Sequence, residues 1–347
     1  MRGGLMLTIY ATCPQSKDVE QSAYLAAVAN VSVWSEQAGC TGILVYTDNG
    51  IVDPWLVSQV VIETTQRLCP LVAVQPVYMH PYSMAKMITS LAFLHGRAIH
   101  LNMLAGGFRN DLLALGDETP HDERYQRTVE YTEIAMALLR GQGPVTVSGR
   151  YYSVSNLQLT PALPAELVPE LLVSGSSPAG LQAARTLGAT AVKYPDRPGE
   201  ERLSSGDEAG AGFGVRVGVI AREDADEAWQ VAHERFPDDR IGQVTHRLAM
   251  GVSDSHWHHQ LSSREGSRTG PANSPAPIEP DPYWLGPFQN YKTFCPYLVG
   301  SHDRVARTLA HYMEIGTTTF ILDIPASEED LAHIGVVFAR AQEMVTA

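Results

Sequence analysis

Strand-like and helix-like patterns of hydrophobic residues alternate from one end of this 347-residue chain to the other. The strand-like runs are rich in β-branched and aliphatic residues, whereas in the segments between them apolar residues recur every three or four positions. The clearest helix covers residues 123–139, and Gly141 follows it as a stop. The predicted strands cover residues 5–10, 41–46, 71–78, 98–104, 170–174, 189–193, 213–221 and 318–323.

Eight strands with helices between most of them predict an α/β fold with a parallel sheet. Such a set closes most naturally into an (α/β)8 TIM barrel, and a doubly wound open sheet is the alternative. Two segments interrupt the alternation. Residues 143–164 hold two short β-rich runs, which predict a hairpin. Residues 237–290 are rich in Pro, Ser, Gly and His, so we expect either a lid over the barrel mouth or a disordered loop.

The predicted strand over residues 213–221 has one apolar face and one face that carries a cation. Alternate residues of a barrel strand point to opposite sides, so Gly214, Arg216 and Gly218 share the inner face. We expect open space around the Arg216 guanidinium, because neither glycine has a side chain. An unpaired buried guanidinium is very unfavourable, so Arg216 either forms an internal salt bridge or binds an anionic ligand.

Two further strands predict an inner wall suited to a planar ring. Asn102 lies on the inward face near the end of its strand, where its amide could bond to a flat heteroaromatic ring or to neighbouring backbone. Ala73 and Gln75 share the inward face of the strand over residues 71–78. The small Ala73 side chain leaves room for a planar cofactor, although core packing explains it equally well.

A strand, a Gly-Ser-Ser turn and a helix follow one another at residues 170–187. Gly175, Ser176 and Ser177 precede Pro178, which suits the first position of a helix. Free backbone amides, two hydroxyls and the helix dipole together predict a phosphate site. The alternative is that a serine only caps the helix. The position late in the barrel favours the phosphate site, because many barrels bind phosphate there.

Composition excludes several classes of partner. The net charge of -13 argues against nucleic acid and favours a small-molecule substrate. No apolar run approaches the length of a membrane span, and the first ten residues do not form a signal peptide. The four cysteines are far apart without a CxxC pair, which predicts reduced, buried thiols in a cytoplasmic protein. The histidines at 256, 258 and 259 have no zinc-like spacing, so we expect a solvated loop and no metal.

Several short motifs, in order, resemble the bacterial luciferase-like monooxygenases. They are TGIL at 41–44, WLV at 55–57, TQRL at 65–68, and HGR at 95–97 leading to Asn102. Within that family, PHDERY at 120–125 together with GSS at 175–177 is similar to the FMNH2-dependent alkanesulfonate monooxygenase branch, and EAW at 227–229 adds to this similarity. The resemblance runs from about residue 35 to 235 and resumes from Tyr297 to the C-terminus.

The resemblance implies one TIM-barrel domain over residues 1–347, with a hairpin excursion at 143–164 and a lid insertion at 237–290. It also implies reduced FMN supplied by a separate NAD(P)H:flavin reductase, with O2 as co-substrate adding at the flavin C4a position to give the oxidising peroxide. Family members form dimers or tetramers, which implies a homo-oligomer. A closed, dry pocket is expected, because water lets such a peroxide decay.

The resemblance also assigns roles to individual residues. Arg216 matches an arginine that faces the substrate, where it would position a carboxylate, a sulfonate or a carrier-bound phosphate arm. Tyr125 also fits a core position by its helical phase. The flavin-binding positions of the family match Gly175, Ser176 and Ser177 at the phosphate, His121 and Tyr125 beside it, Ala73 and Asn102 along the isoalloxazine, and Tyr194 after the sixth strand.

The chain departs from the sulfonate enzymes at several positions. Gly218 stands where they carry a cavity-facing histidine, and their tyrosine after the eighth strand has no counterpart at residues 321–325. Ile51 aligns roughly with a cavity-facing cysteine, and the helix between the sixth and seventh strands is shortened to the Gly- and Glu-rich stretch over residues 198–212. The loss of an imidazole and a phenol removes two proton-transfer groups and opens volume for a bulkier substrate. We therefore predict that simple alkanesulfonates are not the main substrates.

Three other functions stay open at this stage. The first is hydride transfer with the deazaflavin F420 on the same fold. The second is oxidation of an intermediate that is tethered to a carrier protein, with the region over residues 237–290 as the docking surface. The third is flavin binding without catalysis, because the histidine and the tyrosine are missing. Arg247 and Arg264 lie in the predicted lid, where they could reach an anionic substrate.

Overall fold

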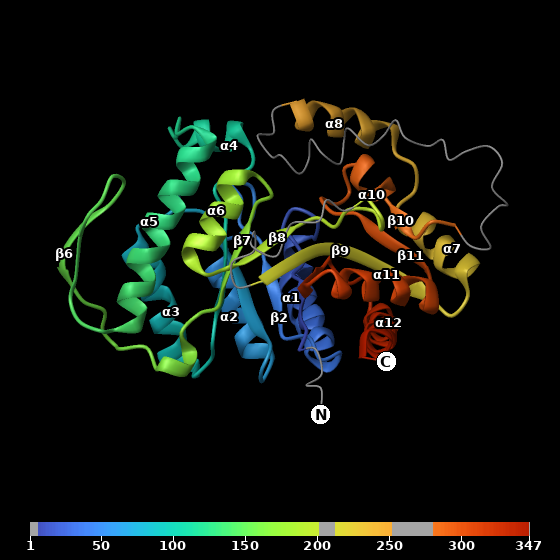
Figure 1. Ribbon diagram of the computed structural model, residues 1–347, viewed down its shortest axis with the longest axis horizontal. Helices are drawn as coiled ribbons and strands as arrows, with labels where there is room; N and C mark the ends of the chain where they lie inside the picture. The colour runs from blue at the N-terminus through green and yellow to red at the C-terminus, as the bar shows by residue number, and fades with distance from the viewer. Residues whose placement is uncertain (1–5, 201–211, 252–279, 347) are drawn as a thin grey trace.

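Eight parallel strands form a closed barrel in the computed structural model, which describes residues 6–200, 212–251 and 280–346 (Figure 1). The ring runs in the order β9-β12-β1-β2-β3-β4-β7-β8, and β8 pairs with β9 to close it. All eight predicted strands are present, so the TIM barrel is confirmed and the open sheet is wrong. The strands are β1 (Thr8–Thr12), β2 (Gly42–Val45), β3 (Cys69–Val74), β4 (His100–Met103), β7 (Leu171–Ser174), β8 (Thr190–Lys193), β9 (Gly212–Arg222) and β12 (Thr317–Leu322).

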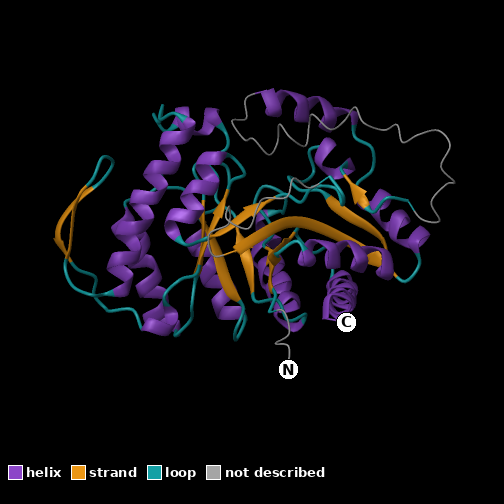
Figure 2. Ribbon diagram, viewed as in Figure 1, coloured by secondary structure: helices purple, strands orange, loops and turns teal. Residues whose placement is uncertain are grey.

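Helices surround the barrel, as Figure 2 shows in purple around the orange strands. Glycines in the left-handed conformation end α3, α5 and α6, so the predicted stop at Gly141 is confirmed. Short elements α4 (Arg109–Ala114) and η1 (Ala165–Leu167) lie in connections. The longer helices are α1 (Gln21–Gln37), α2 (Pro54–Thr64), α3 (Pro81–His95), α5 (His121–Arg140), α6 (Pro178–Leu187), α7 (Ala225–Arg235), α11 (His302–Glu314) and α12 (Glu328–Thr346).

The two faces of each barrel strand belong to different hydrophobic clusters. One face packs against the surrounding helices, and the other faces the interior of the barrel. Leu101 and Met103 of β4, with Ile99 just before the strand, pack outward against helices, which leaves Asn102 on the inner side. The predicted alternation of this strand is therefore confirmed. The interior of the barrel is filled by Tyr10, Leu44, Leu71, Ala73, Leu172, Val192 and Ile321.

A hairpin leaves the barrel after α5, as predicted. β5 (Val145–Ser148) and β6 (Ser153–Leu157) pair antiparallel and project beyond α5 at the left of Figure 1. The Glu130 carboxylate accepts backbone hydrogen bonds from Arg150, Tyr151 and Tyr152, which ties the hairpin turn to the helix. An isolated two-stranded hairpin is only marginally stable, so these hydrogen bonds to α5 help to hold the hairpin in place.

The strand pattern continues beyond the barrel in a way that the sequence did not predict. β9 is 11 residues long, and its second half pairs in parallel with β11 (Tyr297–Ser301), which pairs in turn with β10 (Tyr283–Trp284). The segment over residues 237–290 also contains α8 (Arg240–Gly251) and α10 (Gly286–Gln289). The expectation that it lacks regular structure is wrong for those parts, whereas residues 252–279 lie outside the described residues.

Two expectations from composition can be compared with the structure. All four cysteines are free, and Cys13, Cys69 and Cys295 are buried, whereas Cys40 is half-buried. Within the described ranges, no helix combines the length and the hydropathy needed to cross a membrane.

Candidate active site

One cavity opens at the carboxyl ends of the barrel strands, where TIM barrels carry their active sites. Its volume is about 230 Å³, more than the ~150 Å³ of an engineered apolar cavity that takes up benzene. The cavity therefore has room for an aromatic ring system. It brings together every residue that the sequence analysis singled out as a site residue: Ala73, Asn102, His121, Tyr125, Gly175, Ser176, Ser177, Tyr194 and Arg216.

The turn before α6 treats its two serines differently. The Ser177 hydroxyl accepts a hydrogen bond from the Gly180 amide at 3.1 Å and so caps the helix. The Ser176 Oγ atom is buried and has no hydrogen-bond partner among the described residues. A buried hydroxyl without a partner is unfavourable, so Ser176 is the group that a ligand in this turn would satisfy. The capping role is therefore confirmed for Ser177, whereas a phosphate at Ser176 stays a prediction.

Tyr125 lies against this turn so closely that glycines are required beside it. A Cβ atom at Gly175 would lie 2.2 Å from the Tyr125 hydroxyl, and one at Gly180 would lie 3.1 Å from its ring. Burial raises the pKa of Tyr125, although a hydrogen bond with Ser177 partly opposes the shift. The His121 ring meets the Tyr125 ring edge-on at 5.3 Å. The first turn of α5 thus supplies both side chains to the same end of the cavity.

Asn102 is held by a side chain rather than by neighbouring backbone. Its Oδ1 atom accepts a hydrogen bond of 2.8 Å from the Ser174 hydroxyl, on the adjacent strand β7. The amide nitrogen is then the group that Asn102 can offer to the cavity. Ala73 pairs with Asn102 in the register between β3 and β4, so the small side chain and the amide lie next to each other.

The Arg216 side chain points into the cavity and forms a salt bridge with a carboxylate, which is one of the two interactions predicted for it. Its Nη2 atom lies 3.6 Å from Asp323 Oδ1, and the two side chains are only 11% and 10% exposed. The guanidinium also lies over the Tyr46 ring at 4.7 Å. Its Nε atom is buried without a hydrogen-bond partner in the part of the chain that the structure describes. The salt bridge is confirmed, whereas an anionic ligand on Arg216 stays a prediction.

The expected open space around Arg216 is not present. A Cβ atom at Gly218 would lie 2.3 Å from the Tyr297 ring, which comes from β11 and fills the space that the glycine leaves. A Cβ atom at Gly214 would lie 3.2 Å from both Thr319 and Val192. The prediction that Gly218 opens volume for a bulkier substrate is wrong, because a long-range contact occupies that volume.

Asp323 and its partners are site residues that the sequence did not predict. The Asp323 Oδ2 atom accepts hydrogen bonds from the hydroxyls of Tyr297 at 2.8 Å and Thr293 at 2.5 Å. Burial and the neighbouring Asp323 charge raise the pKa of Tyr297 well above its ordinary value, so it stays a phenol that donates. One signal was available, because a carboxylate near the end of a neighbouring strand is one of the two partners that an inward arginine can have.

Tyr194 also lines the cavity, at the end of β8. Burial, together with Cys295 and Asp323, raises the pKa of Tyr194 well above its ordinary value. Within the described ranges, no group of three or more His, Cys, Asp or Glu side chains could hold a metal ion. The residues at 256, 258, 259 and 264 lie outside those ranges, whereas Arg247 is exposed on α8.

These features can now be compared with known proteins. A family model described as luciferase-like monooxygenase matches residues 5–319. The chain belongs to the luciferase-like monooxygenase family. It is therefore an enzyme, as the resemblance of its motifs predicted.

A curated relative is 32% identical over 331 residues, which cover 93% of this chain and 92% of the relative. It is BtrO of Niallia circulans, and its name describes a monooxygenase of the 4-(γ-L-glutamylamino)butanoyl group on the BtrI acyl-carrier protein. The predicted placement in the alkanesulfonate branch is not supported by this match. The coarser prediction of a luciferase-like monooxygenase is confirmed.

Solved structures of luciferase-like enzymes share the fold. The riboflavin lyase RcaE, crystallised with modified FMN and riboflavin, superposes with a TM-score of 0.73 at 16% identity, over 99% of this chain and 93% of that one. An F420-dependent secondary alcohol dehydrogenase superposes with a TM-score of 0.65 at 14% identity, over 97% and 99% of the two chains. At this identity the likeness shows the barrel alone.

Proposed function

We propose that this enzyme uses reduced FMN and O2 to insert one oxygen atom into an acyl group that a carrier protein holds as a thioester. The other oxygen atom leaves as water, and a separate NAD(P)H:flavin reductase supplies the reduced FMN. The observation that carries the proposal is the buried Ser176 hydroxyl at the start of α6, which has no partner among the residues that the structure describes and shares one cavity with Asn102. The similarity to a monooxygenase of an acyl-carrier-protein substrate supports the substrate class.

The residues of the cavity fit FMN. The turn at Gly175 to Ser177 offers a buried hydroxyl and the positive end of α6 to a phosphate. The amide of Asn102 and the small Ala73 side chain suit the edge and the face of a flat ring. His121 and Tyr125, on the first turn of α5, would flank the phosphate side.

When bound, reduced FMN supplies the two electrons that O2 needs in order to react with the acyl group. The protein contributes binding, orientation and exclusion of water. Leu44, Val192 and Ile321 line the cavity with apolar surface, which limits water near the reacting atoms. Arg216, held by Asp323, keeps its Nε donor for an anionic group of the substrate or of its carrier arm. Tyr297 and Thr293 keep the Asp323 carboxylate in place by donating to it.

The cofactor is tested first, without turnover. The protein is titrated anaerobically with reduced FMN and, separately, with reduced F420. The proposal expects saturable binding of reduced FMN, and exclusive binding of F420 would overturn it in favour of hydride transfer.

The substrate class is tested next, with the BtrI carrier protein charged with 4-(γ-L-glutamylamino)butanoate as the probe. Reduced FMN and isotope-labelled O2 are added, and mass spectrometry of the acyl group follows. The proposal expects one labelled oxygen atom in the acyl product and no sulfite from alkanesulfonates. Reduction of O2 only to hydrogen peroxide with this probe and with the matching pantetheine thioester would overturn the substrate class.

A further inference from the structure

Helix α8 is anchored to the protein by one side. A Cβ atom at Gly242 would lie 2.1 Å from the Asn290 carbonyl oxygen, so the helix approaches that backbone closely. The Gln243 amide donates to Asn290 Oδ1 at 3.0 Å, and the His246 ring packs edge-on against Phe288 at 4.5 Å. These contacts fix which face of α8 turns away from the protein.

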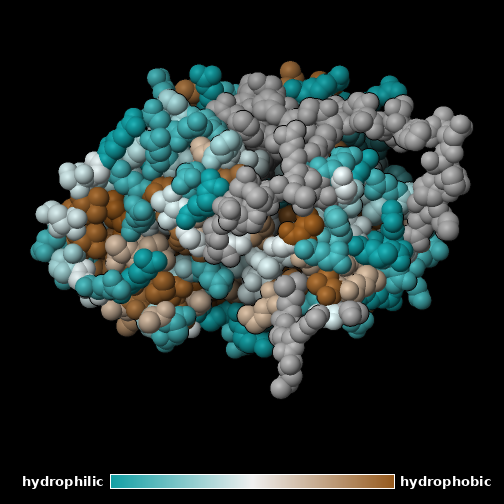
Figure 3. Space-filling model, in the orientation of Figure 1, coloured by the Kyte–Doolittle hydropathy of each residue, from teal (hydrophilic) through white to brown (hydrophobic). Residues whose placement is uncertain are grey.

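The outward face of α8 combines apolar and basic residues. Ile241, Val244 and Leu248 are 80%, 48% and 71% exposed, and their spacing places them in one stripe along the helix. Arg240 and Arg247 are also exposed and lie two turns apart along one flank of that stripe. Figure 3 shows hydrophobic atoms beside hydrophilic ones along the upper edge of the molecule, over α8. We call these five residues the α8 face.

The charge of the α8 face is opposite to that of the whole protein. The chain carries a net charge of -13, but the sequence of α8 contains two arginines and neither aspartate nor glutamate. Asp239, directly before the helix, is paired with Lys292 at 2.8 Å. An exposed apolar stripe beside cations fits a partner surface on which apolar residues are flanked by carboxylates.

The α8 face lies close to the candidate active site. The His246 ring, on the anchored side of α8, contacts the Tyr291 ring at 6.2 Å, and Tyr291 contacts Phe294 at 5.7 Å. Phe294 lines the cavity. Two ring contacts therefore connect the helix to the cavity wall. A flexible phosphopantetheine arm, fully extended, reaches on the order of 18 Å by ordinary bond lengths, which is longer than the ring separations of 6.2 Å and 5.7 Å taken end to end.

We propose that the α8 face is the docking surface for an acidic face of the carrier protein that brings the acyl thioester. This inference rests on the proposed function and adds where the partner binds. Arg240 and Arg247 would pair with carboxylates of the carrier, and Ile241, Val244 and Leu248 would pack against its apolar residues. Docking there would place the carrier at the cavity mouth, so that its arm can enter while the carrier stays outside.

The test compares two substrates with the same acyl group in the full-length enzyme. One is the charged BtrI carrier, and the other is the pantetheine thioester, which needs the active site but no docking surface. The double variant Arg240→Glu/Arg247→Glu should lower kcat/KM for the carrier substrate by about tenfold or more and leave the thioester unaffected. The effect should shrink with added salt, because ions screen exposed charges.

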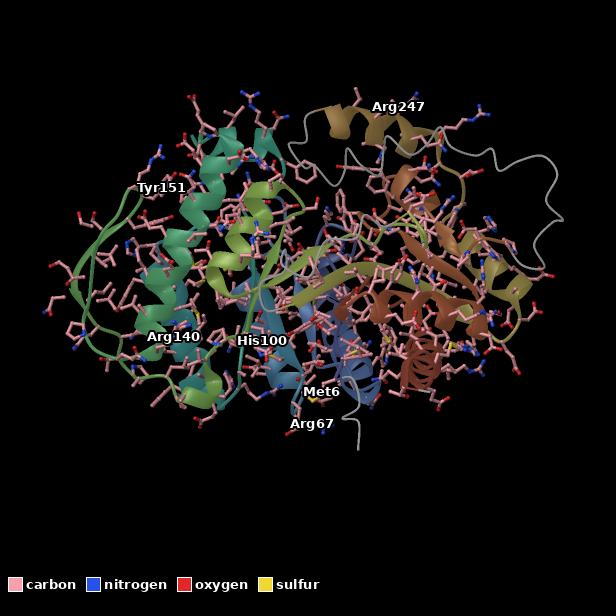
Figure 4. The ribbon with its side chains drawn as sticks, in the orientation of Figure 1. Met6, Arg67, His100, Arg140, Tyr151 and Arg247 are labelled. Atoms are coloured by element: carbon pink, nitrogen blue, oxygen red, sulfur yellow. The ribbon has the colours of Figure 1, made fainter. Side chains whose placement is uncertain are left out.

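A matched variant separates docking from net charge. Arg67→Glu/Arg140→Glu changes the charge by the same amount at exposed positions in the lower half of Figure 4, whereas Arg247 is labelled on α8 at the top. This control should bind uncharged, phosphopantetheinylated BtrI as the wild type does in calorimetry. The α8 variant should bind it about tenfold more weakly.

The apolar stripe is tested with Ile241→Ser/Leu248→Ser, which should also weaken binding of the carrier but keep the oligomeric state and Tm. Three results would overturn the docking proposal. They are equal carrier binding by both arginine variants, dissociation of an oligomer by the serine variant, and a large loss of Tm that shows the stripe to be covered by the chain itself. If the wild type oxidises neither the carrier substrate nor the thioester, the proposed function fails instead, whatever the binding data show.

Discussion

The Tyr297 ring occupies the space above Gly218, and a Cβ atom at that glycine would lie 2.3 Å from the ring. The two residues come from neighbouring strands, and Tyr297 pairs with Gly218 in the parallel register of β11 and β9. The Tyr297 hydroxyl then reaches Asp323, which in turn faces Arg216. A missing side chain on a barrel strand thus makes room for a residue that organises the cavity wall.

Replacement of Gly218 by alanine should therefore be costly. The added methyl group would push against Tyr297 in a buried place, so we expect the free energy of unfolding to fall by roughly 1–3 kcal/mol. Chemical denaturation measures the change. The control is Gly335→Ala on α12, where a Cβ atom meets nothing within 4 Å and the helix should gain up to about 1 kcal/mol. Equal stabilities of both variants would contradict the packing role of Gly218.

The two serines of the turn before α6 should differ in their effects, one on flavin binding and the other on stability. Ser176→Ala removes a hydroxyl that has no partner within the described part of the chain, so stability should be unchanged. Reduced FMN should bind about tenfold to a hundredfold more weakly, because a hydrogen bond to a charged group contributes about 1.5–3 kcal/mol.

Ser177→Ala is the companion variant. It removes the cap of α6 and should lower the free energy of unfolding by about 1 kcal/mol. Thermal unfolding and anaerobic titration of both variants check the pair. A loss of stability in Ser176→Ala, with unchanged flavin affinity, would speak against a phosphate at this turn.

Asp323 should matter mainly as the partner of Arg216. Asp323→Asn leaves the Arg216 cation largely buried without its carboxylate, which should cost roughly 3 kcal/mol. The double variant Arg216→Met/Asp323→Asn should lose less stability than the sum of the two single variants. Denaturant unfolding of all four proteins completes the cycle, and strictly additive losses would show that the two groups do not interact.

The free energy of unfolding should depend on pH in the acid range through the Asp117 carboxyl. Burial alone would raise the pKa of this carboxyl, but hydrogen bonds from Arg127 and Thr119 bring it down to about 2. The stabilising contribution is therefore present above the unfolded value of about 3.9 and is lost as pH falls through about 2. The Arg127–Asp117 contact of 2.6 Å steadies the loop before α5, which carries His121 and Tyr125.

Asp117→Asn is the variant that tests this dependence. The difference in unfolding free energy between the wild type and the variant should be constant above about pH 5 and should narrow between about pH 4 and 2. Unfolding curves at several pH values measure it. A difference that stays constant down to pH 2 would show that the carboxylate is not stabilised by its partners.

Much of the site could be read from local sequence patterns, because neighbouring residues alone decide them. Alternation along β4 and β9 determined that Asn102 and Arg216 face inward. The turn at Gly175 to Ser177, before Pro178, determined where α6 begins. Eight parallel strands with intervening helices close most naturally into a barrel, so the TIM barrel could also be predicted.

Only the tertiary structure decided what fills the space between those elements. That Tyr297 lies over Gly218, and that Asp323 meets Arg216, depends on contacts between residues 79 and 107 positions apart. The anchoring of α8 depends likewise on Asn290, far along the chain. Periodicity reports only which way a side chain points relative to its own backbone. Which distant side chain it meets is decided by packing, because the interior of the folded chain leaves almost no volume unfilled.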